Sequence, residues 1–464
     1  MLVNDIHSGL NPTEIAEVVA PRSVEEISAA LARAAASDRP LSIGGGRHAM
    51  GGQQFAAGGT LLDMRAMDRV LGLDRERGLV EVEAGIMWPE LVAHLIEAQR
   101  GEGPAWGIAQ KQTGADRLTV GGSVSVNGHG RGLAMAPIVA DVEALRLVLP
   151  DGAVVECSRD REPDLFRLAV GGYGLVGVIA AVTLRLAPRR KLERVVEPIT
   201  VPELEAAFAE RIAAGFLYGD MQFAIDSASA DFLHRGVFSC YRPTDPDRPI
   251  PDGQRVLVRD DWRRLLFLGH TDKSRAFTEY ARHYLATSGQ VYWSDLHQLA
   301  DYEDGYHEAL DTALGAVHPG SEMIGELYVP RPALAGFMAA AADDLRRREG
   351  NVIYGTVRLI HRDDETALPW ARDDFACVVI NLHTDHTPDG IAGTAAAFRG
   401  LIDIALERGG SYFLTYHRWA TREQVLAAHP ALPGVLREKR RRDPGGLIQS
   451  DWYRHHAGLL EDAA

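Results

Sequence analysis

The sequence predicts an α+β protein with two domains. Strand-like runs and amphipathic helix patterns are mixed along the chain, and glycine-rich stretches are concentrated in its first 190 residues. At residues 188–191 the glycine density falls, and helices begin to alternate with strands. Because 464 residues are enough for two domains of ordinary size, we place the domain boundary at residue 190.

In the first domain, a helix is predicted to begin at Ser23. Ser23 and Glu26 have the spacing of a capping box, and Ile27 and Leu31 lie on one apolar stripe behind them. Residues 142–156 have the pattern of a β-hairpin, with two apolar runs around a Pro-Asp-Gly turn. Further strands are predicted at residues 61–64, 70–73 and 79–83, and a further helix at residues 88–99.

The second domain is predicted to alternate helices with strands. Apolar residues recur three or four positions apart in some of its segments and at every second position in others. Helices are predicted at residues 201–213, 273–286 and 332–349. Strands are predicted at residues 219–226, 321–330, 352–360 and 376–383.

Residues 40–53 form the most informative segment, a strand that runs into a glycine-rich turn and then His48. Gly44, Gly45 and Gly46 lack Cβ, so their backbone can take positive φ and turn N–H groups toward phosphate oxygens. The turn continues as a glycine-rich loop and opens no helix, which disfavours the dinucleotide-binding Gly-x-Gly-x-x-Gly motif. For a lone glycine run, an ordinary tight turn is the alternative.

Two further glycine-rich stretches follow in the same half of the chain. Residues 118–132 contain an alternating run with Val124 and Val126 and end in Asn-Gly-His-Gly-Arg-Gly. Residues 170–186 place several glycines before a strand that reads as buried. Three such stretches in one half-chain predict a long, extended ligand.

The three stretches resemble the FAD domain of the vanillyl-alcohol-oxidase and p-cresol-methylhydroxylase superfamily, nearest to its alditol and aldonolactone oxidases. Residues 42–49, residues 118–132 and residues 174–184 carry the resemblance, in the family's order and spacing. It implies an FAD-binding domain of two subdomains over residues 1–190, which residues 420–464 close. It also implies an α+β substrate domain with an antiparallel sheet over residues 191–419, which covers the flavin.

The resemblance assigns the pyrophosphate of FAD to the first loop and the isoalloxazine ring to the neighbourhood of the second. The residues expected to bind FAD are Gly44, Gly45, Gly46, Arg47, His48, Ala49, Gly52, Gln53, Thr119, Val120, Gly121, Gly122, Ser123, Asn127, Gly128, His129, Gly130, Gly177, Val178 and Ile179. In many members the histidine after the first loop is bonded covalently to the flavin, and His48 occupies that place. The alternative is that Arg47 and His48 only hydrogen-bond a non-covalent FAD. A second, cysteine tether is absent, because residues 112–118 contain no cysteine.

Oxidation of an alcohol on a flavin needs a group that takes the hydroxyl proton and cations that stabilise the reduced flavin. Strand alternation places Tyr354, Thr356 and Arg358 on one face, and Asn381 on one face of the next strand. An ordinary exposed or satisfied strand surface is the alternative for Tyr354 and Asn381. In alditol-oxidase-like members a glutamate precedes the arginine by two residues, where this chain has Thr356. The residue that takes the hydroxyl proton is therefore not identified, and Glu326 and His417 are the candidates in place of that glutamate.

The resemblance implies an FAD-dependent oxidoreductase that oxidises a CH–OH group of a polyol, sugar, aldonolactone or related alcohol. Gly128 occupies a position where a glycine leaves dioxygen a path to the flavin and an alanine narrows it, which favours an oxidase that releases hydrogen peroxide. The alternative is that Gly128 is needed for positive φ. Two other functions stay open: a dehydrogenase or reductase with another electron carrier, and a non-catalytic flavin-binding protein.

Composition argues against several classes of partner. The formal net charge of −15 disfavours nucleic acids and anionic membranes, which attract positively charged surfaces. The chain has no apolar run of membrane-spanning length and no secretory signal pattern at its N-terminus, so we expect a cytoplasmic protein. Three widely spaced cysteines and scattered histidines indicate no metal site. The oligomeric state is left open.

Overall fold

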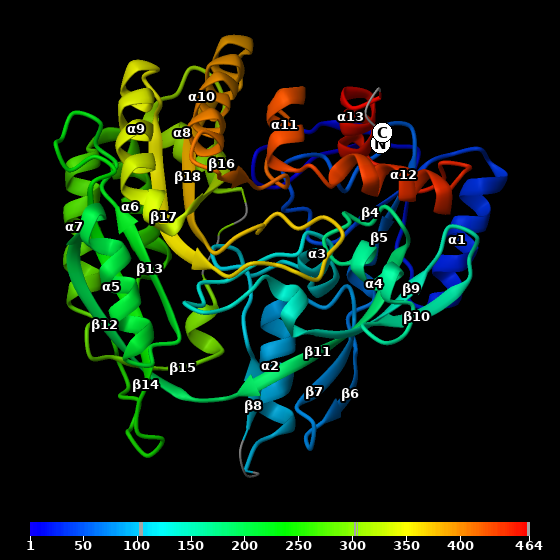
Figure 1. The fold of residues 1–464 in the computed structure, drawn as a ribbon, viewed down its shortest axis with the longest axis horizontal. Coiled ribbons are helices and arrows are strands. Elements are labelled where there is room, and N and C mark those ends of the chain that lie inside the picture. The colour runs from blue at the N-terminus through cyan, green and yellow to red at the C-terminus, as the bar shows by residue number, and fades with distance from the viewer. Residues whose placement is uncertain (102–104, 301–302, 304, 462–464) are drawn as a thin grey trace.

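The computed structural model describes residues 1–101, 105–300, 303 and 305–461. Residues 301, 302, 304 and 462–464, which belong to the predicted ranges 191–419 and 420–464, lie outside the described residues. Two groups of sheets and helices lie next to each other, one built from the N-terminal half and one from the middle of the chain (Figure 1). Helices and sheets are mixed in both groups, so the predicted α+β class is confirmed.

The N-terminal half contains two larger sheets and one strand pair. A three-stranded parallel sheet has the order β3 (Glu17–Val19), β5 (Thr60–Asp63), β4 (Leu41–Gly44). A six-stranded antiparallel sheet consists of β6 (Val70–Asp74), β7 (Leu79–Glu83), β8 (Trp106–Ile108), β9 (Val142–Val148), β10 (Val154–Ser158) and β11 (Val178–Pro188). The strand pair is β1 (Leu2–Val3) with β2 (Thr13–Glu14). The predicted hairpin over residues 142–156 is confirmed as β9 and β10.

Four α-helices accompany these sheets: α1 (Val24–Ala36), α2 (Trp88–Ala98), α3 (Val120–Ser125) and α4 (Pro163–Ala169). Ser23 caps α1, because its side chain accepts a hydrogen bond from the Glu26 amide at 3.3 Å. The Glu26 carboxylate accepts from the amide of Arg22 and not of Ser23, so only one half of the predicted capping box forms. Ile27 and Leu31 of α1 are buried, as their spacing predicts.

Helix α3 corrects the sequence analysis. The alternation of Val124 and Val126 is typical of an extended run, yet residues 120–125 are helical. Thr119 caps this short helix by accepting a hydrogen bond from the Gly122 amide at 3.2 Å. Val120 and Val124 lie one helical turn apart and are both fully buried, so burial of this one face decides the local structure.

The middle of the chain forms one eight-stranded antiparallel sheet, as expected for the second domain. Its order is β15 (Val291–Trp293), β12 (Lys191–Thr200), β14 (Arg235–Pro243), β13 (Tyr218–Phe223), β17 (Val352–Ile360), β18 (Phe375–Asp385), β16 (Gly320–Pro330), β19 (Ser411–Tyr412). One face packs against α5 (Val201–Ala213), α9 (Leu334–Arg347) and α10 (Pro388–Leu406). The other face packs against α6 (Arg259–Thr271), α7 (Lys273–Leu285) and α8 (Tyr306–Leu314).

The C-terminal segment returns to the N-terminal half. It consists of α11 (Arg422–Ala428), α12 (Leu432–Arg442) and α13 (Asp451–Leu459), which lie above the N-terminal sheets in Figure 1. Leu41 of β4 forms a parallel bridge with Ile448, and Tyr173 stacks on Trp452 at 4.4 Å between ring centroids. These contacts join the first and the third glycine-rich stretches to the end of the chain.

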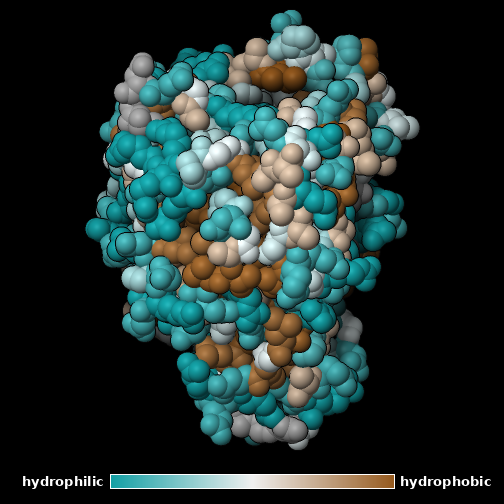
Figure 2. Space-filling view, turned by 90° about the vertical axis from the view of Figure 1, so that its right-hand side faces the viewer, coloured by the Kyte–Doolittle hydropathy of each residue, from teal (hydrophilic) through white to brown (hydrophobic). Residues whose placement is uncertain are grey.

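The surface on the side of α1 and α12 is mostly polar, with apolar side chains gathered across its middle (Figure 2). Among the helices of the described residues, none combines the length and the apolar character needed to cross a membrane. The remaining short elements are 3-10 helices at Met64–Ala66, Ile138–Asp141, Leu296–Gln298 and Arg331–Ala333.

Candidate active site

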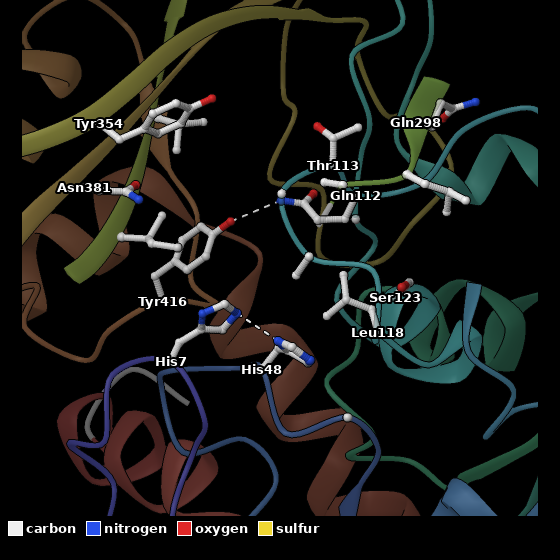
Figure 3. Close-up of a pocket in the computed structure, with 18 of the residues that line it drawn as sticks. His7, His48, Gln112, Thr113, Leu118, Ser123, Gln298, Tyr354, Asn381 and Tyr416 are labelled. Carbon is white, nitrogen blue, oxygen red and sulfur yellow. Dashed lines mark hydrogen bonds between the residues drawn. The ribbon is translucent and has the colours of Figure 1, made fainter. Parts of the chain in front are cut away.

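A cavity of about 780 Å³ lies between the glycine-rich stretches and the eight-stranded sheet. This volume is within the usual range of small-molecule and cofactor sites. Figure 3 shows His48, Leu118 and Ser123 of the N-terminal half on one side and Tyr354 and Asn381 of β17 and β18 on the other. The two groups of sheets therefore contribute opposite walls of one site.

The glycines of the first two stretches allow close approach between the loops. A Cβ on Gly45 would lie 2.2 Å from Thr119 Oγ1, and a Cβ on Gly46 would lie 2.2 Å from the Arg117 carbonyl oxygen. In this loop the backbone has a positive φ at Arg47, where the angle is 59°. The three consecutive glycines before Arg47 do not have a positive φ. The expectation of positive φ at Gly44, Gly45 and Gly46 is thus wrong. Gly45 and Gly46 are needed because a Cβ would collide with the Thr119 side chain and the Arg117 backbone.

Most of the predicted cofactor residues line the cavity. The lining includes Gly44, Gly45, Gly46, Arg47, His48, Ala49, Gln53, Thr119, Gly121, Gly122, Ser123, Gly128, Gly177 and Ile179. The structure places the others behind this lining: Gly52, Val120, Asn127, His129, Gly130 and Val178. An extended cavity with glycine backbone along one wall fits FAD.

The residues behind the lining hold it in place. Asn127 is fully buried with a φ of 49°. Its side-chain Nδ2 donates to Asp363 at 2.9 Å, and its side-chain Oδ1 accepts from the Val139 amide at 3.0 Å. A Cβ on Gly130 would lie 2.8 Å from the Lys111 carbonyl oxygen. These positions are required by packing next to the cavity and make no contact with its interior.

His48 is paired with His7, a residue that the sequence analysis did not select. His48 Nδ1 and His7 Nε2 lie 2.8 Å apart, and the two rings point toward each other at the edge of the cavity (Figure 3). Burial and the neighbouring charge of His48 lower the pKa of His7 well below its usual value. His7 is therefore a neutral partner that orients the His48 ring.

Strand pairing brings the predicted catalytic residues together, with one exception. Tyr354 and Arg358 of β17, Asn381 of β18 and Glu326 of β16 all line the cavity. In the register, Tyr354 lies opposite Asn381, and Glu326 lies opposite Val379 of the same central strand. His417 does not line the cavity: its ring packs on Phe398 and Trp419, and burial lowers its pKa to about 3.

Tyr416, the residue before His417, faces the cavity in its place. Its hydroxyl donates to Glu326 Oε1 at 2.7 Å and accepts from Gln112 at 3.3 Å, the contact drawn in Figure 3. Sequence reasoning missed Tyr416, because neighbouring residues in an irregular segment give no periodic signal for the direction of either side chain.

Glu326 is the centre of a buried polar network. Its second oxygen, Oε2, accepts from the Tyr328 hydroxyl at 2.7 Å and lies 3.0 Å from His129 Nε2. Burial raises the pKa of Glu326, but His129, Arg358 and the Tyr416 hydroxyl outweigh burial and lower this pKa to about 2. The side chain is therefore an anion in the resting protein.

Arg358 brings a buried positive charge to the same wall. It is 5% exposed, and its Nε and Nη1 atoms have no hydrogen-bond partner within the part of the chain that the structure describes. Burial lowers the pKa of Arg358, but the nearby Asp220 and Tyr354 outweigh burial and raise this pKa above its usual value. Unsatisfied donors on a buried cation are costly, so a ligand oxygen in the cavity is the expected partner.

Comparison with known proteins gives a match to one domain family and similarity to several relatives over parts of their length. The FAD binding domain family matches residues 15–158. L-galactono-1,4-lactone dehydrogenase 1, mitochondrial, of Oryza sativa subsp. japonica is 34% identical over 196 residues, 41% of this chain and 32% of the relative. L-gulonolactone oxidase of Mus musculus is 33% identical over 185 residues, 40% of each chain. Cytokinin dehydrogenase 6 of Oryza sativa subsp. japonica is 32% identical over 194 residues, 38% of this chain and 34% of the relative. The matches thus span between about a third and two fifths of these relatives.

Proposed function

We propose that this chain, which carries an FAD-binding domain of the vanillyl-alcohol-oxidase type, oxidises a CH–OH group of a sugar, aldonolactone, polyol or related alcohol. The observation that carries the proposal is the cavity wall opposite the glycine stretches, where Arg358, Tyr416 and Glu326 converge. Relatives with the names L-galactono-1,4-lactone dehydrogenase and L-gulonolactone oxidase support this substrate class.

The proposal includes a division of the chain. Residues 1–190 form an FAD-binding domain of two subdomains, residues 420–464 close it, and residues 191–419 form the substrate domain. Its support is that β11 ends at Pro188 in the six-stranded sheet, whereas β12 begins at Lys191 in the eight-stranded sheet. The bridge between Leu41 and Ile448 supports the closing role of the C-terminal segment.

Bound FAD would supply the hydride acceptor for the alcohol carbon, and residues of the cavity wall hold and move the hydroxyl proton. The substrate hydroxyl donates to the Tyr416 oxygen, and the Tyr416 proton moves to Glu326 across their 2.7 Å hydrogen bond. Because the pKa of Glu326 is about 2, the proton moves as the hydride leaves and not before. Arg358, whose Nε and Nη1 atoms lack partners among the described residues, donates hydrogen bonds to the substrate oxygen while its O–H bond breaks.

A panel of alcohols, sugars and lactones tests the function. We expect at least one compound to bleach the flavin absorbance under anaerobic conditions, and hydrogen peroxide to appear when air is admitted. Bleaching without peroxide would favour a dehydrogenase or reductase with another electron carrier. A flavin that no compound in the panel bleaches would refute the proposed substrate class.

Gly128 supports dioxygen as the electron acceptor. It lines the cavity, and its φ is not in the positive range, so the alternative need for a left-handed backbone is wrong. A Cβ at this position would lie 3.5 Å from the Ser123 carbonyl oxygen and 3.9 Å from Val126 Cγ2, which are ordinary contacts. The fold thus has room for a methyl group here, and the glycine leaves that space open.

Gly128→Ala is expected to slow reoxidation of the reduced flavin by dioxygen about tenfold, equal to ~1.4 kcal/mol of barrier. The added methyl group would fill the space that Gly128 leaves open at the cavity wall, while its contacts stay ordinary. Stopped-flow mixing of the reduced protein with oxygenated buffer measures the rate. Anaerobic flavin reduction and the melting temperature are the controls and should not change; an unchanged reoxidation rate would exclude the gating role.

We propose that His48 holds the flavin covalently, with His7 fixing its orientation. After denaturation in acid, we expect the flavin of the wild-type protein to stay with the precipitated polypeptide. His48→Ala should release all of it to the supernatant, whereas His94→Ala, which changes an exposed histidine of α2, should release none. Complete release from the wild type would show that Arg47 and His48 only hydrogen-bond the cofactor.

A further inference from the structure

A second cluster of ionisable side chains lies apart from the Glu326 network. Glu322 of β16 is 4% exposed and faces histidines from three other elements. Its Oε1 atom lies 3.1 Å from His270 Nε2 of α6 and 3.3 Å from His383 Nδ1 of β18. Its Oε2 atom lies 3.0 Å from Nδ1 of His307 of α8 and accepts a hydrogen bond from the Tyr306 hydroxyl.

The spacing of these atoms suits a metal ion. The ligand atoms of His270, Glu322 and His383 all lie within 4.8 Å of one another. Zinc binds imidazole nitrogen and carboxylate oxygen at about 2.0–2.2 Å in a tetrahedron, which puts ligand atoms roughly 3.4 Å apart. The two carboxylate to imidazole distances of 3.1 and 3.3 Å are close to that separation.

The surroundings of His383 also suit a metal ligand. Its other ring nitrogen, Nε2, lies 3.4 Å from Asp385 Oδ1. A carboxylate behind a metal-binding histidine is a common arrangement, because it fixes the ring and makes the ligating nitrogen more basic. A Cβ on Gly320 would lie 2.4 Å from the His383 ring, so a glycine in the adjacent strand makes room for the ring in this position.

The chemistry of the donor set favours the same occupant. Glu322 is buried, and its two carboxylate oxygens lie within 3.3 Å of nitrogens of His270, His307 and His383. Borderline divalent metals such as zinc prefer such a set of imidazole nitrogen and carboxylate oxygen.

We propose that His270, Glu322 and His383 bind one divalent zinc-class cation, with His307 next to the site. Glu322, Tyr306 and His307 line the cavity, so the cation would lie at the cavity wall and join α6 to the sheet. The site is not recognisable in the sequence, because its ligands lie far apart in the chain on separate helices and strands. The proposal departs from the sequence-based expectation of no metal site, and a zinc titration tests between the two.

The competing account is a metal-free hydrogen-bonded cluster, in which Glu322 accepts from three imidazoles and one tyrosine. The two accounts differ in metal content. The flavin-loaded protein is dialysed against chelator, titrated with zinc chloride, and measured by calorimetry and by mass spectrometry of bound metal. We expect close to one equivalent of zinc per chain and a melting temperature several degrees higher with zinc than without it.

Variants make the assignment specific. His270→Ala and Glu322→Gln should each abolish zinc binding and the zinc-dependent rise in melting temperature, while His94→Ala should bind zinc like the wild type. Glu322→Gln keeps the side-chain shape, and retained flavin absorbance shows that each variant is folded. A wild-type protein that binds no zinc, or variants that bind as much as the wild type, would overturn the proposal. Either result leaves the test with alcohol substrates unaffected.

Discussion

Glu326→Gln is expected to lower kcat/KM for alcohol oxidation by about 10²–10⁴-fold while FAD stays bound. The substitution keeps the size of the side chain but removes the negative charge that receives the Tyr416 proton at 2.7 Å. Hydride departure then leaves the hydroxyl proton without an acceptor. Anaerobic stopped-flow reduction of the flavin, with the compound that bleaches it in the substrate panel, measures this step directly.

Two further variants separate proton transfer from a general disturbance of the network. Tyr416→Phe removes the connecting hydroxyl and should also slow flavin reduction, with a changed pH profile. Glu205→Gln changes an exposed glutamate of α5 and should match the wild type. Flavin reduction in Glu326→Gln within about twofold of the wild-type rate would contradict the proton relay.

Arg358→Lys is expected to lower kcat/KM by about 10²-fold or more, although the positive charge is kept. The Nε and Nη1 donors of Arg358 lack partners among the described residues, so they are available to a ligand oxygen. Lysine offers a single ammonium group and cannot reproduce the planar fork of the guanidinium. Separate measurement of kcat and KM shows whether the loss falls on the reaction or on substrate binding.

A matched control for this substitution is Arg100→Lys, which changes an exposed arginine paired with Glu97 and should leave both constants unchanged. The melting temperature of Arg358→Lys also matters, because a shorter side chain leaves space in a buried wall. Wild-type kinetics in a folded Arg358→Lys protein would show that the guanidinium binds neither the substrate nor its developing charge.

Local patterns predicted much of the fold. The helix over residues 201–213 has its predicted bounds, and the strand over residues 352–360 matches β17. In these segments the residues that the period assigns to the core are buried. The long helix α10 was missed, because its many alanines and glycines give a weak contrast between its faces. Strands β14 and β15 were missed as well, and only their pairing with β12 shows why they form.

By itself, the sequence determined the cofactor side of this protein. Glycine-rich stretches act through short segments of backbone, so Gly45, Gly121 and Gly128 are recognisable without knowing what packs against them. The stretches carry the family resemblance that implies FAD, and the match of the FAD binding domain family over residues 15–158 confirms this cofactor.

Only the tertiary structure decided the substrate side. The sheet order β17-β18-β16 brings Glu326 to the wall that Arg358 occupies, and it places Tyr416 in the cavity instead of His417. The same packing joins His7 to His48 across a separation of 41 residues. Strand order and side-chain direction in irregular segments depend on contacts between distant parts of the chain. No local pattern encodes such contacts, and for that reason the hydrogen bond between Tyr416 and Glu326 is visible only in the folded protein.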